Sequence, residues 1–390
     1  MKGAKPRLLL IGNTLETFGG GEKWLLDVAT LLKGQYSITV LNPVSKKSIL
    51  KASRSQLSKH YDLRGINIIN LPSLGIWSTA FGTESFLLVV PKLKYMSLIK
   101  DSIKCADVIY CLTANPILLG VIVQFASIYH KKLIFGVHNP SFYKLFERSR
   151  SIKQAFMNRG YRKILSRIRY FHVLNVEDEW LIKSAYPKST VFRIPNFITG
   201  NRPKLAVNKK EFIVLFIARF QTHQKGVDLL PKIIDLVINK VPDIKFHIIG
   251  SGGDGEGIIK DLAASYKSNV KWLGFVDVKA LKKEYSAANL LVLPSRFEGF
   301  PLVVLESQSF GLPVIAFDVK GPREIIKRSY QGSLVAPFDV NKFADLILKF
   351  YLSWDNDSTN YLKIKDMTSK LAYSTYSSKR ILVKITRMLN

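Results

Sequence analysis

The chain has little cysteine, few acidic residues and no apolar run long enough to cross a membrane. Cys105 and Cys111 are its only cysteines, too few for a disulfide framework or a cysteine-based metal site. The longest apolar run covers residues 117–129, whereas a membrane-spanning helix needs about 18 to 20 residues. No secretory leader is recognised. We therefore expect a protein of the reducing cytoplasm that does not span a bilayer, with a buried helix over 117–129.

The shortage of acidic residues leaves a large positive charge. The chain carries 58 Lys and Arg against 29 Asp and Glu, a formal net charge of +29. Such an excess attracts polyanions, which here means nucleic acid, an anionic membrane surface or phosphorylated small molecules. A basic but merely solvated surface is the alternative interpretation.

The length and the hydrophobic pattern predict two α/β domains. A chain of 390 residues exceeds a typical single core. Short β-branched runs alternate with longer amphipathic runs, first up to VFRIPNFI and again from FIVLFIAR onward. The polar stretch 200–211 between them predicts a linker, with domains over 1–199 and 200–370. Open parallel sheets bind ligands beyond the carboxyl ends of their strands, so we expect a cleft between the domains.

Two cations follow a predicted strand of the second half. Arg219 ends the run FIVLFIAR, and Lys225 comes shortly before the next helix. A guanidinium and an ammonium in this place can hold a diphosphate, the first through its planar fork and the second as a point charge. The alternative is that both are ordinary surface cations.

Two glutamates flank a predicted helix start in the stretch RFEGFPLVVLE. Glu298 precedes the turn Gly299-Phe300-Pro301, and Glu306 lies on the helix that follows. The free backbone N–H groups of a helix start favour an anion, whereas carboxylates beside a phosphate are better suited to accept hydrogen bonds from hydroxyl groups. A nucleotide diphosphate sugar would use all of these groups. Ordinary solvated acids at a helix start are the alternative.

Further motifs make the sequence resemble the retaining family 4 glycosyltransferases. The resemblance covers about residues 7–340 and is strongest over 212–337. It is carried by FGGGEKWLLDVA, VHNP, KGVD, GSGG, WLGFV, LPSRFEGFPLVVLESQSFGLPVIA and GPREII. It implies a GT-B fold, in which two Rossmann-like, doubly wound parallel-sheet domains face a central cleft. It also implies retaining transfer of a sugar from a nucleotide diphosphate sugar to an acceptor hydroxyl, with no metal and no further cofactor.

The resemblance assigns donor-binding roles in the second half. Arg219 and Lys225 would hold the diphosphate and stabilise the leaving group, where charge develops. Glu298 would bind sugar hydroxyls with the N–H groups of Gly299 and Phe300. Three more donor-binding positions are implied. Glu306 would accept hydrogen bonds from the ribose hydroxyls, Val276 would lie near the base, and Gly252 belongs to the GSGG loop.

In the first half the resemblance places His138, from VHNP, near the transferred sugar. Gly19, Gly20 and Gly21 would let the first loop approach donor phosphate or acceptor closely. A structural histidine and a flexible turn are the respective alternatives. The resemblance also implies that a last helix, residues 371–390, crosses back to the first domain.

The segment 141–172 combines nine Lys or Arg and one acid with interleaved aromatic residues. This pattern suggests docking of a peripheral enzyme on the cytoplasmic face of an anionic membrane, where the acceptor would be a lipid-linked or membrane-bound glycan. A solvated basic face is the alternative.

Other function classes fit less well. No specific nucleic-acid-binding module is recognised. FGGG and GSGGDG fit the dinucleotide fingerprint of an NAD-dependent oxidoreductase poorly. A metal-dependent transferase would want an acidic pair such as Asp355 and Asp357, which lie in a late polar segment. A catalytically inactive nucleotide-sugar-binding homologue stays an alternative. The sequence does not identify the sugar, the base or the acceptor.

Overall fold

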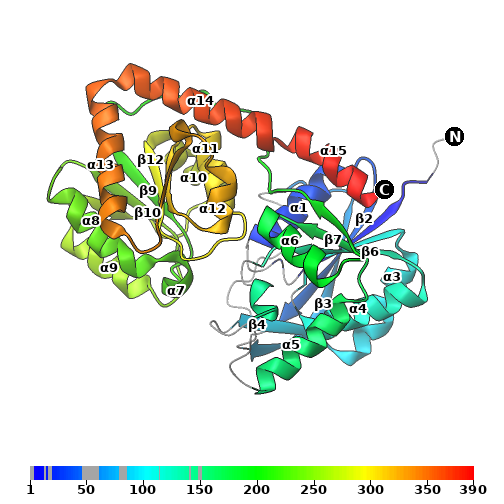
Figure 1. The fold of residues 1–390 in the computed structure, drawn as a ribbon. Helices are drawn as coiled ribbons and strands as arrows, with labels where there is room; N and C mark the ends of the chain where they lie inside the picture. Colours follow the sequence, from blue (N-terminus) through cyan, green and yellow to red (C-terminus); the bar gives the residue numbers. More distant parts are fainter. Residues whose placement is uncertain are drawn as a thin grey trace. The chain divides into compact units, whose positions relative to one another are not determined.

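The structure is a computed structural model that describes residues 4–12, 15, 20–45, 61–78, 86–113, 115–139, 142–147 and 152–390. The chain divides into two compact units (Figure 1), Met1–Pro195 with Leu382–Asn390, and Asn196–Ile381. The division falls a few residues before the expected boundary at 199. The return to the first unit begins at Leu382 rather than at residue 371, because helix α14 (Ser358–Tyr376) belongs to the second unit.

The first unit contains a sheet in the order β4-β3-β2-β1-β5-β6-β7-β8. All neighbouring pairs are parallel except β3 and β4, which form an antiparallel edge that we did not expect. The strands are β1 (Arg7–Ile11), β2 (Ser37–Ser45), β3 (Ile66–Ser78), β4 (Phe86–Pro91), β5 (Val108–Cys111), β6 (Lys132–Val137), β7 (Tyr170–Val173) and β8 (Thr190–Arg193).

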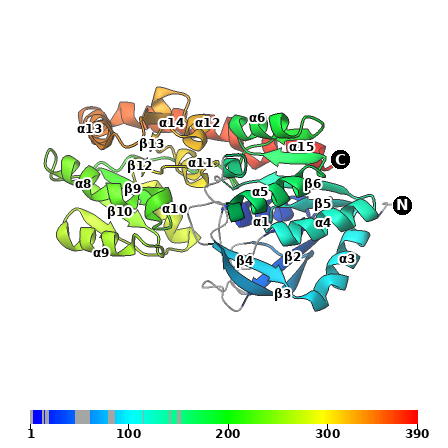
Figure 2. The ribbon, with the colours of Figure 1, turned by 60° about the horizontal axis from the view of Figure 1, so that its bottom comes forward.

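Helices cover both faces of this sheet (Figure 2). The core on one face joins alternate strand residues to α3, α4, α5 and α6, whereas α1 packs on the other face, where Trp24 stacks on Tyr110. The helices are α1 (Gly20–Leu32), α3 (Met96–Cys105), α4 (Pro116–Ile128), α5 (Ile152–Leu165), α6 (Val176–Ala185) and α15 (Ser378–Leu389), with short 3-10 turns η2 (Leu93–Tyr95) and η3 (Phe142–Leu145).

The apolar helix expected over 117–129 is α4. It starts where Asn115 accepts hydrogen bonds from the backbone N–H groups of Ile117 and Leu118, at 2.9 and 3.2 Å, with Pro116 in the first turn. No helix in the part of the chain that the structure describes is long and apolar enough to span a membrane.

The second unit contains an all-parallel sheet in the order β11-β10-β9-β12-β13-β14. Its strands fall on the runs that the sequence predicts. They are β9 (Ile213–Ile217), β10 (Lys245–Ile249), β11 (Val270–Trp272), β12 (Leu290–Leu293), β13 (Val314–Phe317) and β14 (Gly332–Val335).

One core of this unit packs α8, α9 and α13 against the sheet, and Figure 1 shows α10 and α11 on the opposite face. The helices are α7 (Thr222–Lys225), α8 (Leu230–Ile238), α9 (Glu256–Ser265), α10 (Val278–Ala287), α11 (Leu302–Ser309), α12 (Lys320–Ile325) and α13 (Val340–Asn356), with 3-10 turns η4 (Val227–Leu229) and η5 (Ser329–Gln331).

Strand order reverses beside the first strand of each sheet, between β1 and β5 and between β9 and β12. Loops that leave neighbouring strands in opposite directions open a crevice at such a point, and ligands of open α/β sheets bind there. The strand order therefore places the candidate binding crevices at the loops after β9 and β12 in the second unit and at those after β1 and β5 in the first.

Candidate functional site

Lys225 and Glu298, predicted from separate motifs, are in direct contact. Lys225 is the last residue of α7, after β9, and Glu298 lies in the loop after β12. The Lys225 Nζ donates to Glu298 Oε1 at 2.7 Å. Only 5% of Glu298 is exposed, so its carboxylate lies in a poorly solvated place where the ammonium is its compensating charge.

A glycine turn brings these two loops together. Gly226 follows α7 with φ +67°, and a Cβ at this position would lie 2.0 Å from the carbonyl oxygen of Pro294. Any other residue would push the end of α7 away from the loop after β12. Arg296 ties the same loops, since its guanidinium donates to both carboxylate oxygens of Asp228 at 2.8 and 2.6 Å. This bidentate pair was not expected from the sequence.

The turn at Gly299 and Phe300 is held from two sides. Asn196 Nδ2 donates to the Phe300 carbonyl oxygen at 2.7 Å. A Cβ on Gly321, at the start of α12, would lie 2.8 Å from Pro301 Cδ, so GPREII packs closely against the turn. Pro301 is the N-cap of α11. The Phe300 side chain is buried, so its backbone is the part suited to meet a ligand.

Glu306 lies half-buried on α11, on a different part of this edge. Its Oε2 accepts a hydrogen bond from the Tyr285 hydroxyl at 3.1 Å. Tyr285 is buried on α10, and burial, followed by the neighbouring Glu306 carboxylate, raises the pKa of its phenol well above the ordinary value. The phenol thus stays a donor at neutral pH and orients the carboxylate.

Arg219, Gly252 and Val276 follow β9, β10 and β11 at the same edge. Arg219 is exposed, and the next residue, Phe220, donates its backbone N–H to the Gly252 carbonyl oxygen at 2.9 Å. Gly252 has φ +71°, and a Cβ there would meet open space. Val276 is half-buried, two residues after Gly274, whose carbonyl oxygen accepts from the N–H of Gly250 at 2.9 Å. No hydrogen bond or ion pair among the described residues links Arg219 to Lys225.

The first unit surrounds His138 with aromatic and imidazole rings. His138 Nε2 lies 3.3 Å from the Tyr110 hydroxyl and 3.3 Å from His172 Nδ1. Tyr110 and His172 are themselves joined at 2.5 Å, and His172 Nε2 lies 2.7 Å from the Ile194 carbonyl oxygen. The Trp24 ring packs on the other three rings with centroids 4.8 to 5.1 Å away. We refer to Trp24, Tyr110, His138 and His172 as the ring cluster.

The glycine motif lies at the start of the helix that contributes Trp24 to the ring cluster. Gly20 and Gly21 begin α1, the helix that carries Trp24. A Cβ on Gly21 would make an ordinary contact with Leu112 Cδ1 at 3.9 Å, so space alone does not require glycine there. Gly19 lies outside the described residues.

The ring cluster is neutral at pH 7. Burial lowers the pKa of His172 to about 4, and burial together with His172 lowers the pKa of His138 well below its ordinary value. Burial also raises the pKa of Tyr110 well above its ordinary value. These groups therefore exchange hydrogen bonds rather than charge.

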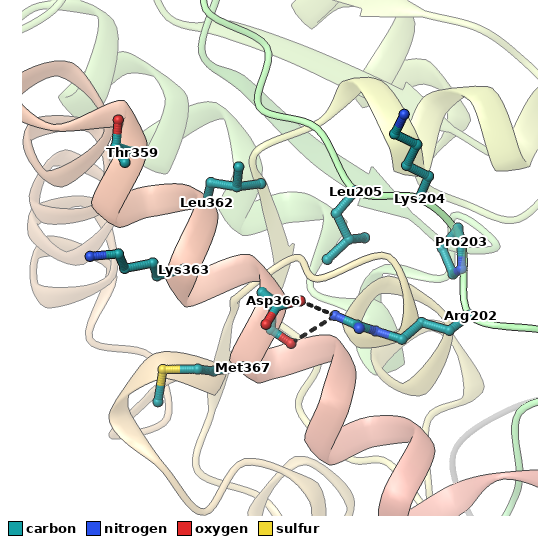
Figure 3. Close-up of a pocket in the computed structure, with 9 residues that line it drawn as sticks. All are labelled: Arg202, Pro203, Lys204, Leu205, Thr359, Leu362, Lys363, Asp366 and Met367. Carbon is teal, nitrogen blue, oxygen red and sulfur yellow. Dashed lines mark hydrogen bonds and ion pairs between the residues drawn. The ribbon is translucent and has the colours of Figure 1, made fainter.

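A separate hollow of about 620 Å³ lies in the second unit between residues 202–205 and α14 (Figure 3). Arg202 bonds to Asp366 across it. None of the predicted site residues lines this hollow. Within the described ranges, no three His, Cys, Asp or Glu side chains gather to hold a metal ion.

Comparison with known proteins follows this division of the chain. Residues 197–364 match the family model for glycosyl transferases group 1. The matched region contains all the strand-end residues of the second unit described above. A poly(ribitol-phosphate) alpha-N-acetylglucosaminyltransferase of Staphylococcus aureus is 29% identical over 212 residues, which cover 54% of this chain and 41% of the relative. The chain spans 36%, 37% and 41% of the length of three curated relatives that it matches.

Solved structures resemble the whole chain. TarM of S. aureus superposes with a TM-score of 0.74 at 17% identity and covers 99% of both chains. Alr3699/HepE of Anabaena in complex with UDP gives 0.73 at 18% identity, covering 98% of this chain and 99% of the other. With the two parallel-sheet α/β units, these neighbours confirm the GT-B fold class. The cleft expected between the domains stays a prediction.

Proposed function

We propose that the chain is a retaining family 4 glycosyltransferase that moves a sugar from a nucleotide diphosphate sugar to an acceptor hydroxyl. The observation that carries this proposal is the contact of Lys225 with the buried Glu298 at the strand-order reversal of the glycosyl transferases group 1 domain. One polar pair there offers a cation to a diphosphate and a carboxylate to sugar hydroxyls.

In the proposed reaction, Arg219 and Lys225 stabilise the diphosphate that leaves as the glycosidic bond breaks, in place of a metal ion. Glu298 accepts from the sugar hydroxyls, with the N–H groups of Gly299 and Phe300 beside it. Glu306, held by Tyr285, accepts from the ribose hydroxyls. No protein side chain is assigned as the base, since a donor phosphate oxygen can take the proton of an acceptor that attacks from the leaving-group face.

The remaining donor contacts are proposed from position. Val276 and Gly252 follow the outer strands of the second sheet and would line the donor's binding site, with Val276 beside the base. In the first unit, Gly20 and Gly21 begin α1 next to the ring cluster, and His138 would lie near the transferred sugar. Gly19 would belong to the same loop.

A panel of UDP, GDP and ADP sugars, observed by ligand-detected NMR with EDTA present, tests the donor site. We expect one donor to bind wild type, and to bind Lys225→Met and Glu306→Ala at least ten times more weakly. Lys240→Met is the matched control, because Lys240 pairs with Asp345 on the exposed surface of the same unit. Turnover to a product with the donor's anomeric configuration would support retention. Inversion would exclude it, and binding without turnover on any acceptor would favour an inactive homologue.

The proposed acceptor is a lipid-linked or membrane-bound glycan, because α5 presents an apolar and basic surface. Ile152 is 90% and Phe156 80% exposed, and Arg159, Arg162 and Lys163 are exposed on the same helix. The opposite side of α5 buries Tyr161 and Leu165 in the core. An exposed apolar stripe among cations favours an anionic lipid surface. The polymer named for the S. aureus relative, poly(ribitol phosphate), is also an anionic acceptor.

Sedimentation with phosphatidylglycerol vesicles, compared with phosphatidylcholine vesicles at low and high salt, tests this surface. We expect binding to the anionic vesicles, weakened by salt and by Phe156→Ser. Leu352→Ser, which removes an exposed apolar side chain of the second unit, should leave binding unchanged. Absence of binding at either salt concentration would end the membrane proposal without affecting the donor site.

A further inference from the structure

The ring cluster admits one arrangement of protons. The Ile194 carbonyl oxygen can only accept, so His172 Nε2, 2.7 Å away, carries the proton of that ring. Since His172 is neutral, its Nδ1 has a lone pair. The Tyr110 hydroxyl, 2.5 Å from Nδ1, therefore donates to it. The proton of Tyr110 and the lone pair of His172 Nδ1 are thereby both used.

The same reasoning fixes the tautomer of His138. Its Nε2 lies 3.3 Å from the Tyr110 oxygen and from His172 Nδ1, and neither of these atoms has a proton left to give. An unprotonated Nε2 would direct its lone pair at two other lone-pair atoms, so Nε2 must carry a proton and donate to the Tyr110 oxygen. Burial and His172 hold the pKa of His138 well below its ordinary value, which leaves Nδ1 unprotonated.

The local packing is built around this arrangement. A Cβ on Gly136, in β6, would lie 2.4 Å from the Tyr110 hydroxyl oxygen, so glycine leaves the room that the hydroxyl occupies. Tyr110 and His172 lie on the strands that flank β6. His138 itself is half-buried, and its Nδ1 makes no hydrogen bond to any residue that the structure describes.

We propose that Tyr110 and His172 are positioning residues that hold His138 with its proton on Nε2, so that Nδ1 accepts a hydrogen bond from a hydroxyl group of the bound sugar. This inference rests on the proposed function for the identity of the ligand, whereas the tautomer is a property of the free protein. His138 then acts as a fixed acceptor that favours a hydroxyl over a deoxy position, and it neither removes nor supplies a proton.

Imidazole ¹⁵N NMR of the full chain labelled on histidine tests the tautomer without a ligand. The chain has six histidines, and His138→Gln identifies the signals of His138 by their loss. We expect a proton on Nε2 and an unprotonated Nδ1 at pH 7. In His172→Phe, Tyr110 loses its acceptor and can donate to His138 Nε2, so the proton should move to Nδ1. In Tyr110→Phe, His138 Nε2–H can donate to the freed His172 Nδ1, so the wild-type tautomer should persist.

The controls keep these outcomes decisive. Tyr36→Phe also removes a hydrogen-bonded tyrosine hydroxyl of the first unit, the one that donates to Asn390, and should leave all signals of His138 in place. A wild-type proton on His138 Nδ1 would overturn the proposal. An unchanged tautomer of His138 in His172→Phe, with an intact fold by circular dichroism, would overturn it as well. A changed tautomer in Tyr110→Phe would show that His172 Nδ1 does not accept from His138 Nε2–H when the Tyr110 hydroxyl is absent.

The ligand is tested with the same panel of UDP, GDP and ADP sugars, each against its nucleoside diphosphate alone. The Nδ1 signal should move on addition of the sugar nucleotide that binds and should not move with the corresponding nucleoside diphosphate. His172→Phe should lose about tenfold in affinity for the sugar nucleotide, as expected for one hydrogen bond, but none for the nucleoside diphosphate. Binding that leaves Nδ1 unmoved would overturn the sugar contact. If no nucleotide sugar binds, the proposed function and the ligand fall together, while the tautomer is still decided on the free protein.

Discussion

Removing the ammonium of Lys225 should destabilise the second unit strongly, because it leaves a buried carboxylate without its counter-charge. The side chain of Glu298 is 7% exposed and that of Lys225 20%. Breaking a buried ion pair from one side costs about 3 to 5 kcal/mol. Partial exposure of Lys225 lets water approach, so we expect the lower end, about 3 kcal/mol, for Lys225→Met. For a unit of this size that corresponds to a fall of roughly 6 to 12 °C in its melting temperature.

Calorimetry and urea unfolding of a double-mutant cycle would measure this effect. Lys225→Met with Glu298→Gln should recover most of the loss, since the amide has no charge to desolvate. Lys240→Met, which breaks an exposed pair, should stay within about 0.5 kcal/mol of wild type. A loss below about 1 kcal/mol for Lys225→Met, or strict additivity in the cycle, would refute the reasoning that Glu298 depends on Lys225 for its charge.

Three further predictions concern pH and the glycine turn. The His172 pKa of about 4 lies below its ordinary 6.5, so the unfolded chain binds more protons than the folded chain between these pH values. About 3 kcal/mol of stability should therefore be lost as pH falls through this window. Urea unfolding at pH 7 and 4.5 measures this loss, and an equal loss in His172→Phe would contradict the prediction. Burial lowers the pKa of Lys365 to about 8 from 10.5, so the folded chain releases this proton first and stability should rise by about 3 kcal/mol as pH increases from about 8 to 10.5. Urea unfolding of Lys365→Met over the same pH range should show no such rise. If the stability of Lys365→Met still rose with pH, Lys365 would be excluded as the source. Gly226→Ala should lower the free energy of unfolding by about 3 kcal/mol or more, because Gly226 has a positive φ and lies close to the Pro294 carbonyl oxygen. Gly274→Ala, with φ +65° and open space around the position, should cost about 1 kcal/mol. Equal shifts in melting temperature for the two variants would argue against the close approach at Gly226.

The strands of the second unit could be predicted because each is a short β-branched run between turn residues, and buried parallel strands need apolar residues on both faces. The antiparallel edge of the first sheet could not be predicted in this way. β3 contains Pro72 and Gly75, which weaken a strand pattern. Pairing with β2 and β4 decides its conformation, and pairing over long sequence separations is not visible in a local pattern.

The candidate site was predictable where charged groups follow a strand. Lys225 and Glu298 were recognisable as candidates, but their contact depends on Gly226 and on the backbone of Pro294, 68 residues later in the chain. Asn196, Tyr110 and His172 carried weaker signals. His172 is, with Asn175, one of two polar residues in the otherwise apolar run FHVLNV, a pattern that indicates a satisfied buried histidine as readily as a functional one. Its partners on β5 and after β6 are brought to it by the sheet alone.

The Lys225–Glu298 pair and the ring cluster stabilise buried polar groups in opposite ways, the first by charge and the second by neutral hydrogen bonds. In the second unit Glu298 stays close to an ammonium, so a diphosphate that draws Lys225 toward itself leaves the carboxylate in need of another donor. A sugar hydroxyl at Glu298 supplies that donor, which makes phosphate and sugar binding interdependent under the proposed function. The ring cluster of the first unit has no charge to give up, because burial keeps both imidazoles neutral. Under the proposed function, it would therefore recognise a hydroxyl without responding to the charge that develops on the leaving diphosphate, and the charged groups of the second unit would stabilise that charge.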